Sequence, residues 1–161
     1  IMAGTRRPLE DVILEQVSYI FGLDGTISRA EETQLAQLEA QVTRVKDPTL
    51  SPSTPASNLP LGLPAQYWLS LRGYDPPEVA GDLQQPMLIL QGERDYQVTI
   101  QDFKGWQDAL SSRQDVQFRM YPRLNHLFIE GDGMSTPAEY QQVGHVAQIV
   151  VDDIALWIKQ H

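Results

Sequence analysis

The stretch MLILQGERDYQV, residues 87–98, is the part of the sequence that indicates the fold. It begins after Pro86 with four apolar residues, and no polar residue alternates among them. A strand of this kind is usually covered on both faces, as in the middle of a parallel sheet. Asp95 follows Gly92 by three residues. An acid just past the carboxyl end of such a strand lies where open α/β sheets place their functional groups.

A second strand is predicted at 116–121, where apolar residues at 116, 118 and 120 alternate with more polar ones. It leads to Asn125 and His126. Because parallel strands end at the same edge of a sheet, we expect Asp95 and His126 to be neighbours, with Asp95 accepting a hydrogen bond from His126 Nδ1. The alternatives are a turn aspartate and a loop or core histidine, and the spacing alone does not exclude them.

These residues resemble the C-terminal half of an α/β-hydrolase, most closely the bacterial serine esterases and peptidases related to dipeptidyl and acylaminoacyl peptidases. The resemblance covers nearly the whole chain. It is carried by QGERDYQV at 91–98, by YP at 121–122 with NH at 125–126, and by YWL at 67–69 with RGY at 72–74. It implies that Asp95 is the acid and His126 the base of a catalytic triad. The nucleophile elbow of the family, G-x-S-x-G, is missing, because no serine here lies between two glycines at that spacing.

The implied fold class is α/β: a partial α/β-hydrolase fold with the last three parallel strands, flanking helices and a helical lid insertion. Residues 1–161 would be the C-terminal portion of one hydrolase domain, with the lid at about 22–80. Residues 1–4 are expected to be the end of the first of these strands. A helix is expected from Pro8 to Gly22. The last helix, at 146–160, is expected to bury its apolar residues, which are Val146, Ile149, Val150, Ile154, Trp157 and Ile158.

Within the predicted lid, Ser28 and Glu31 form a capping-box pattern at the start of a helix. Apolar residues at 35, 38, 42 and 45 give this helix one narrow apolar edge, which must pack on the body of the protein or on a second copy. The proline-rich stretch 48–64 is predicted to be an extended connector. After the strand at 87–91, Thr99 and Asp102 are predicted to cap a helix.

Three aromatic residues of the lid, Tyr67, Trp68 and Tyr74, are candidates for binding an acyl or aromatic substrate group. The alternative is that they anchor the lid to the body. Glu93 and Arg94 could form a salt bridge or contact substrate, and the structural role is favoured. Asn125 is expected to hold a left-handed position in its loop, and contact with substrate is the less favoured alternative.

Composition excludes several classes of function. The net charge of −9 argues against binding to nucleic acid or to an anionic membrane surface. The absence of cysteine excludes disulfides and cysteine-ligated metal sites. Three scattered histidines do not suggest a zinc site, so neither a metal nor a cofactor is expected. No apolar run reaches the roughly 20 residues of a membrane span. Because the chain opens within a predicted strand, any signal peptide would lie upstream, and localisation cannot be read.

The sequence therefore predicts a serine hydrolase fragment that carries the acid and the base but not the serine, and that is inactive alone. The full-length parent would cleave a small ester or peptide through an acyl-enzyme. The alternative is a non-catalytic α/β interaction module that dimerises through the lid helix. A sheet cut beside its first strand would expose an apolar edge, so a homo-oligomer through that edge or the lid is also expected.

Overall fold

A computed structural model describes all 161 residues, which form two compact units. One unit comprises Ile1–Arg6 and Asp75–His161, and the other comprises Arg7–Tyr74. The second unit starts and ends earlier than the predicted lid at 22–80, and it includes the first helix. Its role as a lid stays a prediction. None of the helices combines the length and the apolar character that a membrane crossing requires.

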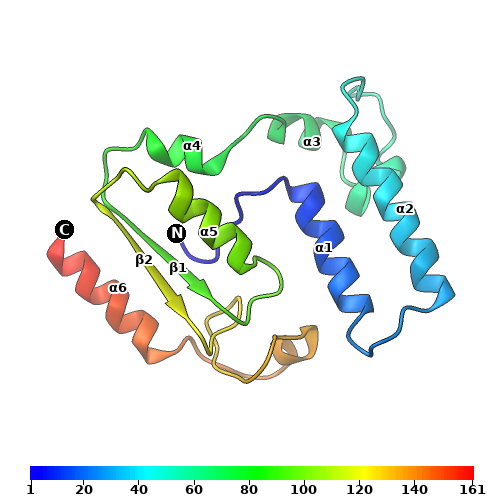
Figure 1. Ribbon diagram of the computed structural model, residues 1–161. Helices are drawn as coiled ribbons and strands as arrows, with labels where there is room; N and C mark the ends of the chain where they lie inside the picture. The colour runs from blue at the N-terminus through cyan, green and yellow to red at the C-terminus, as the bar shows by residue number, and fades with distance from the viewer. The chain divides into compact units, whose positions relative to one another are not determined.

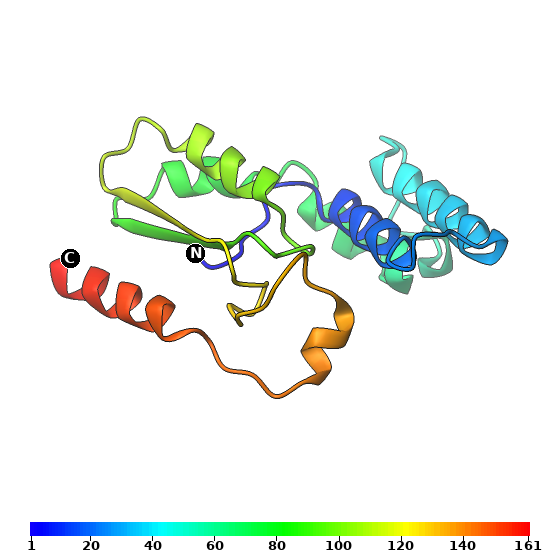
Figure 2. The ribbon, with the colours of Figure 1, turned by 60° about the horizontal axis from the view of Figure 1, so that its bottom comes forward.

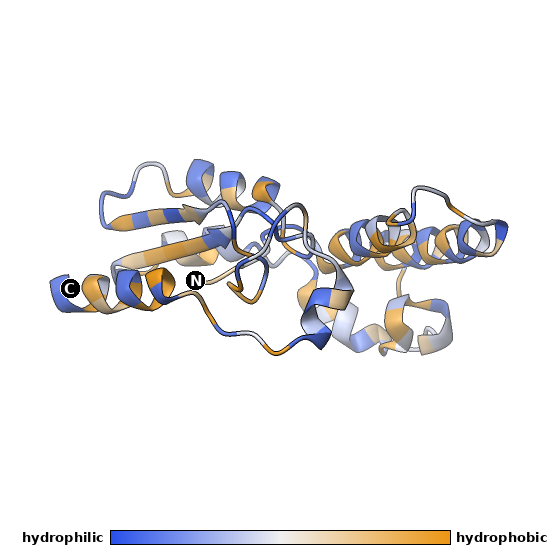
Figure 3. Cartoon of the chain, turned by 90° about the horizontal axis from the view of Figure 1, so that it is seen from below, coloured by the Kyte–Doolittle hydropathy of each residue, from blue (hydrophilic) through white to orange (hydrophobic).

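The first unit is built on a parallel pair of strands, β1 (Met87–Gly92) and β2 (Val116–Tyr121). The register pairs the first residues of the two strands, and likewise the last. Every residue of β1 is buried, as its apolar run predicts. Figure 3 shows the contrasting pattern of β2, where hydrophobic and hydrophilic residues alternate. The helix α5 (Ile100–Ala109) connects the strands.

Helices cover both faces of this small sheet, as Figures 1 and 2 show. On one face, Leu88 and Leu90 pack with residues of α6 (Gln148–Gln160). On the other face, Met87 and Ile89 pack with α5 and with α4 (Pro76–Gly81). The side chains of β1 thus alternate between two cores, which is why the strand is apolar throughout. The mixed α/β class is confirmed.

The N-terminal segment differs from the predicted third strand. It forms one parallel bridge, between Met2 and Leu90, in place of a continuous ladder. Two backbone hydrogen bonds of 2.9 Å, from Leu90 to Ile1 and from Ala3 to Leu90, hold it beside β1. The backbone then leaves the extended conformation at Ala3, whose φ is +45°. The segment therefore lies parallel beside β1, as expected for the end of a strand, but it contributes a single bridge, and the sheet has two strands in place of the predicted three.

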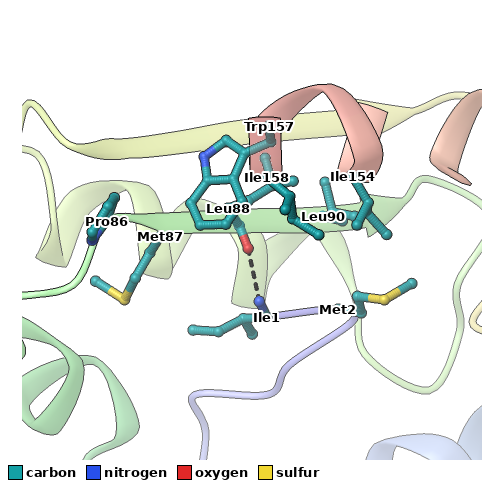
Figure 4. Close-up of a pocket in the computed structure, with 9 residues that line it drawn as sticks. All are labelled: Ile1, Met2, Pro86, Met87, Leu88, Leu90, Ile154, Trp157 and Ile158. Carbon is teal, nitrogen blue, oxygen red and sulfur yellow. Dashed lines mark hydrogen bonds between the residues drawn. The ribbon is translucent and has the colours of Figure 1, made fainter. Parts of the chain in front are cut away.

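An apolar groove lies at this edge of the first unit, between the N-terminal segment, β1 and α6 (Figure 4). The amino group of Ile1 donates a hydrogen bond of 2.7 Å to the Leu88 carbonyl, and burial lowers the pKa of this amine. The side chains of Ile1 and Met2 are 43% and 46% exposed. The edge is thus apolar and open, and its pairing with a second copy stays a prediction.

The second unit is helical, with α1 (Leu9–Phe21), α2 (Arg29–Lys46) and α3 (Ala65–Leu71). The predicted capping box starts α2: Ser28 Oγ accepts from the Glu31 N–H, and Glu31 Oε2 accepts from the Ser28 N–H. The apolar edge of α2 packs against α1 and α3 within this unit, where Leu38 and Val45 join a core with Ile13. The edge is therefore covered by its own unit.

The proline-rich stretch is packed, contrary to the prediction of an extended connector. It contains two short 3-10 helices, η1 (Ala56–Asn58) and η2 (Pro60–Gly62). Leu50 and Leu59 are buried in the core of the second unit, and Leu59 is fully enclosed. Isolated leucines without periodicity gave no sequence signal for this packing.

Candidate active site

Asp95 lies in the turn that follows β1, and both oxygens of its carboxylate accept hydrogen bonds. Oδ1 accepts hydrogen bonds from the backbone N–H groups of Gln97 (2.8 Å) and Val98 (3.0 Å). Oδ2 accepts from Gln91 Nε2 at 3.3 Å. The side chain of Asp95 has no exposed surface. A buried carboxylate held this way has a fixed orientation, because rotation would break several hydrogen bonds at once.

His126 lies in a tight loop after β2, and because β1 and β2 are parallel and in register, this loop is at the same end of the sheet as Asp95. The loop is organised by Asn125, whose Oδ1 accepts from the N–H groups of Leu127 (3.0 Å) and Ile129 (3.1 Å). The left-handed position predicted for Asn125 is instead taken by Phe128, whose φ of +58° is a strained conformation for a residue with a side chain. Strain of this kind persists only where surrounding contacts enforce it, and here Phe128 is buried.

The two side chains meet as the sequence predicts. His126 Nδ1 lies 2.8 Å from Asp95 Oδ2. Because an ionised carboxylate only accepts hydrogen bonds, this geometry places the ring proton on Nδ1. Nε2 makes no hydrogen bond within the chain, and the His126 side chain is 29% exposed. The pair can therefore take up a proton at Nε2 and stabilise the resulting imidazolium.

Close backbone packing joins the two turns. A Cβ atom at Gly92, the last residue of β1, would lie 2.3 Å from the Leu124 carbonyl oxygen and 2.8 Å from that of Asn125. The Arg94 N–H also donates to the Leu124 carbonyl at 3.0 Å. The loop that carries His126 thus rests directly on the backbone that leads to Asp95.

The aromatic candidates lie in the second unit. Trp68 is buried in its core at 2% exposure, whereas Tyr67 and Tyr74 are 40% and 58% exposed. The rings of Tyr67 and Trp68 make an edge-to-face contact, with 5.5 Å between centroids. Trp68 thus packs within its own unit, and the role of the three residues in substrate binding stays a prediction.

Two supporting features were not predicted in detail. Gln91, fully buried, binds the Val98 and Gly92 carbonyls as well as Asp95. The only sign of this role in the sequence is that Gln91 is a polar residue at the end of an apolar strand. Arg94 forms its ion pair with Glu139, at 2.6 Å, and not with the neighbouring Glu93. Glu139 is 45 residues away, and the sequence contains no local sign of that partner.

No family model matches the chain, and no solved structure matches it. Among curated proteins, Esterase EstD from Thermotoga maritima is 39% identical over 158 residues, which are 98% of this chain. The chain spans 36% of the length of that esterase. The chain is homologous to Esterase EstD over nearly its whole length, in agreement with its resemblance to part of an α/β-hydrolase esterase.

Proposed function

We propose that this chain is the part of a serine esterase that supplies the acid, Asp95, and the base, His126. The observation that carries the proposal is the hydrogen bond of 2.8 Å between the buried Asp95 carboxylate and His126 Nδ1. Homology to an esterase supports it independently. The order of acid before base along the chain is also that of α/β-hydrolases.

In the proposed reaction, a serine hydroxyl from the remainder of the protein attacks the ester carbonyl while His126 Nε2 takes its proton. Asp95 holds the ring tautomer and stabilises the imidazolium. The imidazolium then gives the proton to the alcohol that leaves, and an acyl-enzyme remains. Water then attacks the acyl group while Nε2 takes its proton; the bond to the serine oxygen breaks, the imidazolium returns the proton to that oxygen, and the carboxylic acid is released. The oxyanion hole would also come from the remainder of the protein.

The substrate in this proposal is a small carboxylic ester. Peptide hydrolysis by the same acyl-enzyme route is the second activity that the sequence resemblance implies. Tyr67, Trp68 and Tyr74 are proposed to contact the acyl group, with Tyr67 and Tyr74 the better candidates because their side chains are exposed.

The test uses the full-length protein with p-nitrophenyl acetate turnover and fluorophosphonate labelling read by intact mass. We expect one adduct on a serine outside residues 1–161, and a loss of turnover of at least about 10³-fold in His126→Gln. His145→Gln is the matched control, because His145 is exposed and should be neutral. The isolated chain should give neither adduct nor turnover. A stoichiometric adduct on a serine of this chain would refute the proposal.

The alternative of an interaction module that dimerises through α2 loses its main support. Its basis was the narrow apolar edge of that helix, and this edge packs against α1 and α3 within its own unit. A coiled-coil seam between two copies would need these side chains to be free.

A further inference from the structure

Arg94 lies next to Asp95 in the sequence, but its side chain binds the segment from Asp132 to Glu139. The guanidinium is 5% exposed. Its Nε donates to the Gly133 carbonyl at 2.5 Å, and Nη2 donates to the Asp132 carbonyl at 3.3 Å. Nη2 also donates to Glu139 Oε1 at 2.6 Å. One arginine side chain thereby makes hydrogen bonds to both ends of the segment from Asp132 to Glu139.

Glu139 carries the connection onward to the His126 loop. Its second oxygen, Oε2, accepts from Asn125 Nδ2 at 3.3 Å. The other end of that amide, Asn125 Oδ1, accepts the two N–H groups that shape the loop around His126. An unbroken chain of hydrogen bonds therefore runs from Arg94 through Glu139 and Asn125 to the turn that holds the imidazole.

The backbone of Arg94 also makes hydrogen bonds to the same loops. Its N–H donates to the Leu124 carbonyl at 3.0 Å, and its carbonyl accepts from the Ser135 N–H and hydroxyl at 3.0 and 2.6 Å. The guanidinium also lies close to Gly131, where a Cβ atom would meet Nη1 at 2.2 Å and Cζ at 2.5 Å. A side chain at position 131 would therefore displace the guanidinium.

We propose that Arg94, through its ion pair with Glu139, is a positioning residue for His126. It keeps the imidazole in the orientation in which Nδ1 is hydrogen bonded to Asp95. The inference rests on the proposed function, because the ring orientation matters for catalysis only if His126 is the base. The planar guanidinium suits the task, since it can satisfy several carbonyls and a carboxylate at once, which a lysine cannot. A buried charge without its partner would force the loops to rearrange.

The test reads the tautomer of His126 in the ¹⁵N-labelled chain, by long-range proton–nitrogen correlation at about pH 9, where imidazoles are neutral. The wild-type ring should carry its proton on Nδ1. In Arg94→Gln, Glu139→Gln and Gly131→Ala, we expect the ratio of Nε2–H to Nδ1–H to rise about tenfold or more, because the charge-assisted hydrogen bond to Asp95 is no longer held. Gly131→Ala removes no charge and displaces the guanidinium by volume alone, so it covers the case in which Arg94→Gln fails to fold.

Arg113→Gln is the matched control. Arg113 also binds an acid, Asp115, and three backbone carbonyls, but at the opposite end of the strands. The two ends of a six-residue strand are about 17 Å apart. Its loss should leave the His126 tautomer unchanged. A shift in this control as large as in Arg94→Gln, or folded Arg94 and Gly131 variants with the wild-type tautomer, would overturn the proposal.

A second arm separates this inference from the proposed function. In the full-length protein, Arg94→Gln should lower kcat about 10²-fold with little change in KM, as expected when a catalytic group is misplaced by about 1 Å. Arg94→Lys should recover part of that loss. If the tautomer shifts but the full-length protein takes no fluorophosphonate label, the positioning role stands and the esterase proposal fails. If the label forms but the tautomer does not shift, the esterase proposal stands and the positioning role fails.

Discussion

Substitution of Gly92 by alanine should disturb both stability and the Asp95–His126 pair. Gly92 ends β1, and the added Cβ would lie 2.3 Å from the Leu124 carbonyl oxygen. An ordinary contact needs about 3.4 Å, so one side must move by about 1 Å. Both sides are backbone, and neither can yield by a change of rotamer. The loop that carries His126 is the side that is free to move, because β1 is buried and hydrogen bonded to β2.

The structure sets the size of the effect. A displacement of about 1 Å would stretch the contact between His126 Nδ1 and Asp95 Oδ2 from 2.8 Å to beyond hydrogen-bond range. Overpacking of this kind costs about 1–3 kcal/mol of unfolding free energy. Asp95 would keep its three other donors, so the acid should stay in place while the base moves.

The assay combines urea unfolding, followed by tryptophan fluorescence, with the nitrogen spectrum of the His126 ring. Gly81→Ala is the matched control: Gly81 belongs to α4 in the same unit, and nothing lies within 4 Å of its added Cβ. It should be neutral, or stabilising by up to about 1 kcal/mol. In the full-length protein, Gly92→Ala should reduce ester turnover about 10²-fold. If Gly92→Ala unfolds at the wild-type urea concentration and keeps Nδ1–H, then close packing at Gly92 does not position the base.

Three further predictions concern the rest of the chain. Ser28→Ala breaks the capping box with Glu31 and should cost about 1 kcal/mol in urea unfolding; no change would mean that water replaces the cap. The hydrogen bond from Arg113 holds the pKa of Asp115 below its usual value, so the carboxylate contributes stability above the unfolded pKa, which is lost as the pH falls through the folded one. The difference in urea midpoint between wild type and Asp115→Asn should therefore shrink below about pH 4, and a constant difference would contradict this. Light scattering at high concentration should show a mass above 18.1 kDa, because the edge beside Ile1 is apolar and open; a strict monomer would argue against it.

The elements that could be predicted are those whose signals are local. The helix α2 begins at a capping box and stops before Asp47-Pro48, and every part of that signal lies within the segment itself. The strand β1 was predicted because an apolar run must be covered on both faces, and two cores do cover it.

The errors came from contacts distant in sequence. Thr99 takes the N-cap position of α5 as predicted, but its side chain makes no capping hydrogen bond. Asp102 lies in the first turn of the helix, and its Oδ1 accepts from two distant groups, the Thr5 hydroxyl (3.0 Å) and the Arg6 N–H (3.1 Å). The last helix was expected to bury six apolar residues, and three of them, Val146, Ile149 and Ile158, are 45–62% exposed. Periodicity indicates which residues share a face, but only the surrounding fold decides how far that face is covered.

The candidate site was predictable in part for the same reason. Asp95 and His126 could be named because each follows a strand, and parallel strands bring their ends together. Glu139 could not be named, because no rule of spacing connects it to Arg94.

The hydrogen bonds that fix the Asp95–His126 pair all lie within the unit formed by Ile1–Arg6 and Asp75–His161. Gln91 and two backbone N–H groups hold the acid, and the Arg94–Glu139 pair holds the loop of the base. The orientation of the imidazole therefore needs no help from the second unit, nor from the serine that the proposal places elsewhere. A serine brought to Nε2 would meet a base that is already aligned. The entropy of orienting the acid and the base would then already be lost on folding and not in the reaction. Groups oriented in advance accelerate a reaction most for this reason.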